Sequence, residues 1–376
     1  MRKTFIFFAS VAIVALSGCS SEEIANMETS VSNAIGFNLV GSNPVTRATP
    51  ITSSNITTTD FDVLAFTSGQ AGDINPFMGE KMDGVKVVCK GSKWDYDNPA
   101  EQAYWPTEKL DFYAVNPARI ENSAFYGYSI GNDKQEIYYA AADEFATADV
   151  HKNLDIMYAT AFEQTKDTYG GKVKLTFKHA LSQVLFRART ELESIEVEVK
   201  GVKIHNVSFS GTFSFPKKDE ELSAANWVVK TIDKPNGWSA YRSQNPVTVK
   251  STTEAVWLSD QSDAFITVPQ TLTKWETVPG TPVTKEQGDT KLQSYLGITC
   301  KIKQNGEYLC GSDSSYYTIY VPFGVEWKPG YRYIYTLIFG GGYDPQGNPV
   351  LTPIEFEPEV SEWTDSEIDS HFVTSE

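Results

Sequence analysis

Histidine and cysteine are the side chains best suited to metal binding or nucleophilic chemistry, and this sequence of 376 residues holds only four of each. The histidines are His151, His179, His205 and His371, and no two of them have the short spacing, such as His-x-x-x-His, that zinc sites use. His179 precedes an apolar stretch and is interpreted as a structural histidine with satisfied hydrogen bonds. The sequence therefore predicts no zinc site.

Other ligand and catalytic patterns are weak. The glycine run at 340–342 lacks the Lys-Ser/Thr pair of a phosphate-binding loop. Asp344 and Asn348 together supply too few oxygen ligands for calcium. Nothing singles out a catalytic pair among the 48 acidic residues, because such pairing is spatial. We therefore predict no enzyme activity, no cofactor and no metal.

Three cysteines, Cys89, Cys300 and Cys310, remain after Cys19 near the N-terminus, and an odd number cannot all pair within one chain. An Asn-Gly pair at 305–306 is a strong hairpin signal between the last two. A two-residue turn there sets a register in which the side chains of Cys300 and Cys310 face opposite sides of the ribbon. A disulfide between them would require a β-bulge that shifts this register.

Charge and composition narrow the class of protein. The sequence has 32 Lys and Arg against 48 Asp and Glu, a formal net charge of −16, so it lacks the basic surface that nucleic acids or anionic membranes attract. Hydrophobic residues at 41% and aromatic residues at 13% are too frequent for an intrinsically disordered chain. We expect a folded protein of two domains that does not bind nucleic acid.

The N-terminus has the pattern of a signal peptide at residues 1–18. Two basic residues precede an apolar run at 4–16, which is too short to cross a bilayer as a helix. The run ends in Leu-Ser-Gly-Cys at 16–19, which resembles the lipobox of bacterial lipoproteins. That resemblance implies cleavage before Cys19 and acylation of Cys19 as a membrane anchor. Ser20 and Glu22-Glu23, which follow the cysteine, resemble the outer-membrane sorting and surface-export signals of Bacteroidetes-type lipoproteins, and this implies a place at the cell surface.

After the signal peptide, the pattern of residue types indicates strands and shows almost no helical periodicity. Short runs of β-forming residues bounded by Pro, Gly, Asn or Asp occur at 61–66, 110–115, 155–159, 173–177, 184–188, 194–199, 202–207, 211–215, 265–268, 316–322 and 331–339. Without helical crossovers, antiparallel β-sandwiches are the expected architecture. We predict an all-β protein with two β-sandwich domains in tandem, at 48–172 and 173–376, after a propeptide at 19–47.

Several motifs follow one another in a fixed order. They are Thr-Arg-Ala-Thr at 46–49, Tyr-Trp-Pro at 104–106, His-Ala-Leu-Ser-Gln at 179–183, the run 202–215 and Trp-Lys-Pro-Gly-Tyr-Arg-Tyr at 327–333. With the lipobox, they resemble the fimbrillin-type proteins of the Bacteroidales over nearly the whole chain. The resemblance implies two transthyretin-like domains and a structural subunit of an adhesive fimbria. It also implies lipoprotein export, cleavage by an arginine-specific protease and strand exchange with other fimbrial subunits. Shaft, tip, anchor and accessory roles, and any ligand on a host or bacterial surface, stay open.

The residue pattern near the N-terminus is compatible with cleavage and strand exchange. Val31, Ile35, Phe37 and Leu39 share one parity, so residues 31–40 are expected to form a leading strand with one apolar face that must be buried. A Thr- and Ser-rich stretch follows and contains the only basic residue between positions 3 and 81. This residue is Arg47, and an arginine-specific protease would cut between Arg47 and Ala48. Departure of the leading strand would expose a groove and an unpaired sheet edge.

A replacement strand is expected near the C-terminus. Val350, Ile354, Phe356 and Val360 share one parity, and glutamates occupy the alternate positions. The segment is either a donor strand for another subunit or the last strand of its own domain. The tail at 364–376 is the other candidate donor.

The alternative function is glycan binding by a surface lipoprotein. Eight Trp and 19 Tyr residues could stack on sugars if several of them lay coplanar in an open groove. Against this, Trp105, Trp257, Trp327 and Trp363 stand beside Pro or within alternating patterns, where a core role is more frequent.

Overall fold

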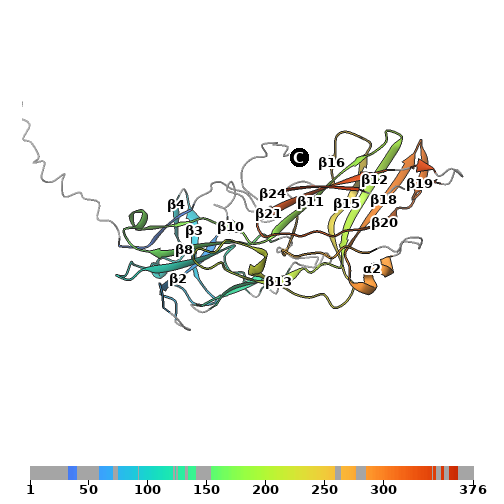
Figure 1. Ribbon diagram of the computed structural model, residues 1–376. Coiled ribbons are helices and arrows are strands. Elements are labelled where there is room, and N and C mark those ends of the chain that lie inside the picture. The colour runs from blue at the N-terminus through green and yellow to red at the C-terminus, as the bar shows by residue number, and fades with distance from the viewer. Residues whose placement is uncertain are drawn as a thin grey trace, which may run out of the picture.

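The computed structural model describes residues 33–39, 59–70, 75–91, 93–121, 123, 126–131, 134–140, 154–258, 264–276 and 285–340, and the backbone of 342–343, 349–350 and 355–362. Its elements are almost all strands, which confirms the predicted all-β class. Figure 1 shows two bodies of strands side by side, with β2 to β4 in one and β15 to β20 in the other.

A six-stranded antiparallel sheet forms the centre of the N-terminal body. Its order is β10 (Lys178–His179), β8 (Met157–Gln164), β5 (Leu110–Asn116), β2 (Phe61–Thr67), β3 (Val85–Lys90) and β4 (Lys93–Tyr96). One face packs against β1 (Gly36–Leu39) and β9 (Lys172–Leu175). The other face packs against a sheet of β14 (Trp227–Val229), β13 (Ser210–Ser214), β7 (Gln135–Ala140) and β6 (Tyr126–Ile130).

Strand β2 shows why this sheet is central. Its first six residues are all buried, which is expected where both faces of a strand are covered. Phe61 and Val63 belong to the apolar cluster on the β1 side, whereas Leu64 and Phe66 belong to the cluster on the β7 side. The run at 61–66, apolar except for the buried Asp62, therefore contributes to two layers at once.

The C-terminal body is a sandwich of two sheets. The first holds β16 (Val256–Trp257), β11 (Ser182–Thr190), β21 (Tyr331–Phe339) and β24 (Glu355–Glu362), and β17 (Phe265–Thr267) also pairs with β11. The second holds β15 (Gly237–Val249), β12 (Ile195–His205), β18 (Tyr295–Gln304) and β19 (Glu307–Cys310), and β20 (Tyr317–Pro322) also pairs with β18. Inward residues of both sheets, such as Phe186, Tyr335, Val197 and Ile298, form one core.

Two strand pairs are parallel, which differs from the antiparallel expectation. They are β1 with β9 and β11 with β21. Between β11 and β21 the chain passes through the opposite sheet and the N-terminal body, so a long β-rich connection replaces the helical crossover of an α/β fold. Parallel neighbours arise here without helical crossovers.

Strands from both sides of residue 172 share one sheet. After β12 the chain returns to the N-terminal body, where β13 pairs with β7 along Ser210 to Ser214, and it then re-enters the C-terminal body at β15. The predicted boundary at residue 172 coincides with the start of β9 but does not divide the strands of the two bodies completely.

Helical structure is sparse in the described part of the chain. One α-helix, α2, spans Lys285–Lys291, and 3₁₀ turns span Pro99–Glu101, Thr168–Gly171 and Ala224–Asn226. A short hairpin joins β22 (Gly342–Tyr343) to β23 (Pro349–Val350). Among the residues described, no helix has the length and apolar character needed to span a membrane.

Candidate functional site

The leading strand β1 lies in a groove of the N-terminal body. Ile35 is 1% exposed and Phe37 is 3% exposed, while Leu39 is half-buried. β1 runs parallel to β9, with Phe37 opposite Val173. On its other side, the Ile35 N–H donates to the Ala103 carbonyl at 2.9 Å. β1 is thus held between β9 and the segment around residue 103.

Aromatic side chains form the floor of this groove. The Phe37 ring lies 6.0 Å from Phe61, 6.5 Å from Phe112 and 5.8 Å from Tyr96, measured between ring centroids. The Tyr96 hydroxyl donates to the Ile35 carbonyl at 2.9 Å. Burial raises the pKa of Tyr96 to about 12, so this hydroxyl stays protonated and able to donate at neutral pH.

The walls of the groove have contacts of their own. The Trp105 Nε1–H donates to the Gly171 carbonyl at 3.0 Å, which ties the segment before β5 to the residue before β9. The Trp105 ring also lies 5.8 Å from Phe112. Neither contact involves β1 itself, although the Trp105 backbone N–H also donates to the Asn33 carbonyl at 2.9 Å.

The C-terminal segment pairs within its own chain. β24 is antiparallel to β21, with Phe356 opposite Leu337 and Val360 opposite Tyr333. β24 lies at the end of its sheet, beside β21 alone. The structure thus places this segment as the last strand of its own body, which was one of the two expected arrangements. An edge position also leaves β24 with only one neighbour to lose.

Several predicted site residues lie outside the described residues. They are Cys19, Val31, Arg47, Ala48 and Ile354, together with the tail at 364–376. Of the predicted set, the structure therefore brings together Ile35, Phe37 and Leu39 in the groove. Sequence reasoning missed the partners of β1. The alternation Lys-Val-Lys-Leu at 172–175 marked β9 as a half-buried strand, but nothing in it identified β1 as the neighbour.

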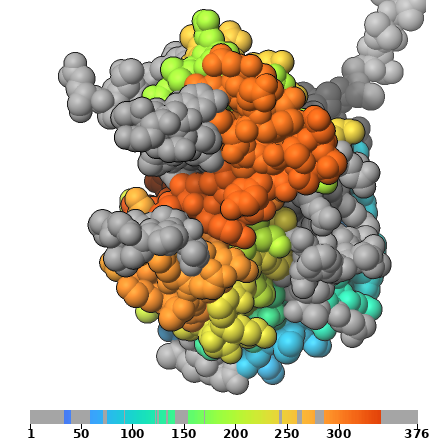
Figure 2. Space-filling model, turned by 90° about the vertical axis from the view of Figure 1, so that its right-hand side faces the viewer, coloured from blue at the N-terminus to red at the C-terminus, as the bar shows by residue number. Residues whose placement is uncertain are grey.

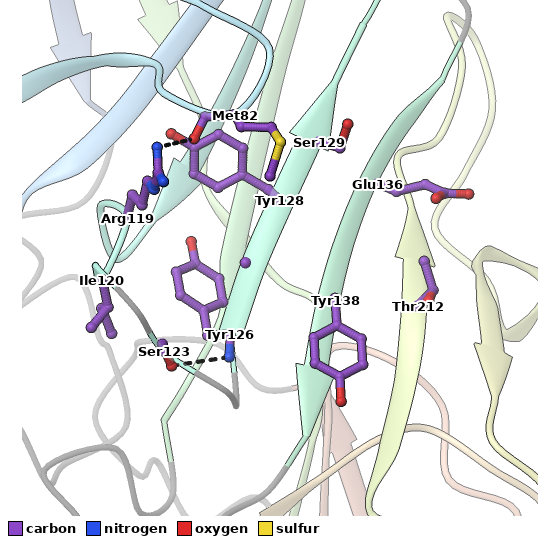
Figure 3. A pocket seen from close by; sticks show the side chains of 11 residues that line it. Met82, Arg119, Ile120, Ser123, Tyr126, Tyr128, Ser129, Glu136, Tyr138 and Thr212 are labelled. Atoms are coloured by element: carbon purple, nitrogen blue, oxygen red, sulfur yellow. Dashed lines mark hydrogen bonds between the residues drawn. The ribbon is translucent and has the colours of Figure 1, made fainter.

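A surface pocket of about 440 Å³ lies at the edge of β6, between the segment at 119–123 and the outer face of β7 (Figure 3). The Arg119 guanidinium donates to the Met82 carbonyl at 2.8 Å, and the Tyr128 hydroxyl donates to Asp62 at 2.6 Å. Burial raises the pKa of Asp62, and the hydrogen bond from Tyr128 opposes that shift. These polar groups are therefore already engaged with the protein itself.

Residues 127–129 of the pocket wall belong to a Gly-x-Ser-x-Gly pattern at 127–131, the pattern of hydrolase nucleophiles. Here Ser129 lies in the extended strand β6, opposite Glu136 of β7, and no strand-to-helix turn presents it. No histidine lines the described wall of the pocket. Ser129 therefore lacks the general base and the backbone geometry that acyl transfer requires.

Exposed aromatic side chains are scattered. Within the described ranges every tryptophan is buried or half-buried, and the exposed aromatics are Phe77, Tyr104, Tyr138 and Tyr317. Tyr138 is the one among them that lines the pocket. The coplanar row of exposed rings that glycan binding would require is thus not found in the part of the chain that the structure describes.

Of the described histidines, His179 is buried and His205 is half-buried. His179 Nδ1 lies 3.0 Å from an Asp155 carboxylate oxygen, and both side chains are almost fully buried. His205 stacks on Tyr295 at 4.4 Å between ring centroids, and desolvation lowers the pKa of His205 to about 4. Across the described residues, no group of three His, Cys, Asp or Glu side chains could hold a metal ion.

The fold is all-β, and the strand β1 fills a groove on the central sheet. The family model for fimbrillin-like proteins matches residues 46–363. The chain therefore belongs to the fimbrillin-like family, whose members are structural proteins of cell-surface fimbriae and not enzymes. No curated protein sequence matches the chain.

Three solved structures are similar to this chain to different degrees. A fimbrial protein from Bacteroides vulgatus has a TM-score of 0.57 and 15% identity, covering 88% of this chain and 99% of that one. A cell adhesion protein from Bacteroides eggerthii has a TM-score of 0.44 and 13% identity, covering 88% and 95%. The fimbrial anchor protein Mfa2 from Porphyromonas gingivalis has a TM-score of 0.34 and 9% identity, covering 88% and 98%. The first of these shares the fold.

Proposed function

We propose that this fimbrillin-like chain is a fimbrial subunit exported as a lipoprotein through Cys19 and activated for assembly by cleavage after Arg47. Cleavage detaches β1, and a strand from another subunit then fills the groove that β1 occupied. The assembled subunit belongs to an adhesive fimbria anchored at the outer membrane.

The observation that carries this proposal is the way β1 is held. It has only four residues, yet Phe37 within it and Ile35 just before it are almost fully buried on the central sheet. Two such side chains contribute about 3–6 kcal/mol of gross burial energy, and the backbone bonds to β9 and Ala103 add to it. This burial energy is enough to hold β1 while it is covalently linked to the rest of the chain. Once the chain is cut after Arg47, another strand can replace β1.

The vacated groove specifies its next occupant. An incoming strand must place large apolar side chains two positions apart, where Ile35 and Phe37 now lie, and must hydrogen-bond along β9. Ile354 and Phe356 have the same residue types at the same spacing. We propose residues 350–362 as the first candidate donor and the tail at 364–376 as the second.

If β24 is donated, it leaves the edge of β21 in its own subunit and pairs with β9 of another subunit. β24 pairs with β21 from Tyr331 to Ile338, so its release exposes the outer edge of β21. The donating subunit gains the pairing along β9 of its partner in return. The exchange is favourable only if the β9 groove binds the strand better than β21 does. The Trp105 wall and the aromatic floor give the groove an apolar surface for that binding.

Limited proteolysis tests the proposal. The full chain is treated with an arginine-specific protease, its N-terminus is sequenced, and its mass is followed by size-exclusion chromatography and electron microscopy. We expect a new terminus at Ala48, followed by oligomers. Arg47→Ala should stay uncut there and monomeric, and Arg47→Lys is the matched variant that preserves charge but not the protease site. Cleavage at Ala48 that leaves β1 bound and the chain monomeric would contradict the proposal.

A further inference from the structure

The hairpin of β18 and β19 begins as the sequence predicts. Asn305 and Gly306 have φ values of 52° and 88°, the left-handed backbone of a two-residue hairpin turn. The two pairs next to the turn follow the expected register: Gln304 with Glu307, and Lys303 with Tyr308.

The next pair departs from that register. Ile302 pairs with Cys310, so Leu309 is an extra residue in β19 and forms a β-bulge. Side chains two positions apart on a strand face the same side, so Cys300 and Ile302 share a face. The bulge turns Cys310 to that face as well, which removes the obstacle that the unbulged register placed between Cys300 and Cys310.

Both thiols lie in the core between the two sheets. Cys300 is 0% exposed and Cys310 is 7% exposed, and both belong to the same apolar cluster. The neighbouring thiol is the largest cause of the pKa shift of each cysteine, raising the pKa of Cys300 and lowering that of Cys310. The third described cysteine, Cys89, lies on β3 of the other body, opposite Trp94, and its thiol donates to the Gly91 carbonyl. Cys300 and Cys310 are therefore each other's neighbours and have no competing thiol nearby among the described residues.

We propose that Cys300 and Cys310 form an intramolecular disulfide when the exported chain meets a disulfide oxidant. The oxidant is a small-molecule disulfide or the disulfide of a thiol oxidoreductase. Such a bond is expected outside the cytoplasm, so its occurrence in cells rests on the export step of the proposed function. The pairing geometry does not depend on that step, and the purified protein tests it directly.

The reaction has a preferred order. The Cys300 thiol lowers the pKa of Cys310, and the Cys310 thiol together with burial raises the pKa of Cys300. The Cys310 thiolate attacks one sulfur of the oxidant disulfide, whose S–S bond breaks and releases a thiolate. That thiolate takes the Cys300 proton. The Cys300 sulfur then attacks Cys310, and the second oxidant thiolate leaves. The protein loses two electrons and two protons, and the oxidant becomes two thiols.

The bond would act at a junction in the sheet. β18 pairs with β20 up to Cys300, which lies opposite Tyr317, and pairs with β19 from Ile302 onward. A disulfide would fix the end of β19 at the point where β18 changes partners. In Figure 2 the orange residues of β18 to β20 form much of the face turned to the viewer, so the bond would brace this exposed end of the molecule.

Mass spectrometry of purified protein tests the proposal. The full chain carries Cys19→Ser to remove the N-terminal thiol, is reduced, and is then incubated with oxidised glutathione, both folded and during refolding from urea. We expect a loss of two hydrogens, a peptide linking Cys300 to Cys310, and alkylation of Cys89 alone. The unfolding equilibrium constant should fall by ~10- to 100-fold on oxidation.

Matched variants separate this bond from other outcomes. Cys89→Ser should still lose two hydrogens. Cys300→Ser should stop at a glutathione adduct on Cys310, because the second thiol is missing. Three alkylated thiols after oxidative refolding, or a linkage to Cys89, would overturn the proposal. If the purified protein forms the bond but protein recovered from the cell surface lacks it, the pairing stands and its role in the fimbria is wrong.

Discussion

The Tyr96 hydroxyl lies 2.9 Å from the Ile35 carbonyl oxygen and donates a hydrogen bond to it across 61 positions of sequence. This bond joins the end of β4 to the start of β1, the strand proposed to leave. Tyr96 is 4% exposed, so the bond is shielded from water. The hydrogen bond between these two residues therefore helps to hold β1 on the central sheet.

Tyr96→Phe should weaken the attachment of β1 while preserving the aromatic floor. The ring is kept, but the Ile35 carbonyl loses its donor, so we expect a loss of about 1 kcal/mol in the free energy of unfolding. Amide hydrogen exchange at Phe37 should become faster than in the unmodified chain. Tyr104→Phe is the control, because Tyr104 is 57% exposed. Equal exchange rates in both variants would show that the bond does not retain β1.

Phe37→Ala should destabilise the precursor by about 3–5 kcal/mol, since it leaves a cavity among Phe61, Tyr96 and Phe112. Urea denaturation measures the change. Leu39→Ala is the matched control and should cost less, because Leu39 is half-buried. After cleavage and removal of β1, the mutant and the original chain should have equal stability. A difference that persists would mean that β1 does not leave.

Sequence patterns predicted this site in part. The alternation of Ile35 and Phe37 indicated an apolar face, and both side chains are buried in the structure. The neighbours of β1 could not be predicted, because Gly36 pairs with Lys172 and strand pairing over such a distance leaves no local signal. The bulge at Leu309 was equally hidden, since the Asn-Gly turn alone favours an unbulged register. The pairing of β13 with β7 in the N-terminal body depends on packing between sheets. The hydrophobic periodicity of the sequence does not indicate which sheet a strand joins.

His205 should make the C-terminal body sensitive to acid. Desolvation lowers its pKa in the folded state to about 4, whereas the unfolded chain has the ordinary value of 6.5. Between these values the unfolded state binds the proton more strongly, so stability falls as the pH falls. The loss between about pH 7 and about pH 5 should be about 2 kcal/mol. His205→Phe keeps a ring against Tyr295 without a titrating group, and urea denaturation at both pH values should show a smaller difference. An unchanged difference would assign the acid sensitivity to other groups.

Cys19→Ala should release the protein from membranes. The apolar run before Cys19 is too short to span a bilayer, so anchoring depends on acyl chains at that cysteine. Cell fractionation and metabolic labelling with palmitate measure the effect. Cys89→Ala is the control and should stay labelled and membrane-bound. Membrane association of Cys19→Ala at the original level would show that another element anchors the chain.

Peptides from the C-terminus should bind the cleaved subunit in trans. Deleting β24 from the chain would also expose the edge of β21, so a fluorescent peptide of residues 350–362 is the cleaner probe. We expect it to bind after cleavage at Arg47 and not before, because β1 fills the groove in the precursor. Fluorescence anisotropy measures the binding.

Three further peptides identify the donor. Phe356→Asp in the first peptide should reduce affinity at least ~100-fold, because a charge would enter the apolar site that Phe37 leaves. Glu357→Gln, at the alternate position, should bind almost normally. A peptide of residues 364–376 tests the tail, and its binding in place of the first peptide would make the tail the donor. If neither peptide binds the cleaved subunit, C-terminal donation is wrong for this chain, and the groove must accept a strand from a different fimbrial protein.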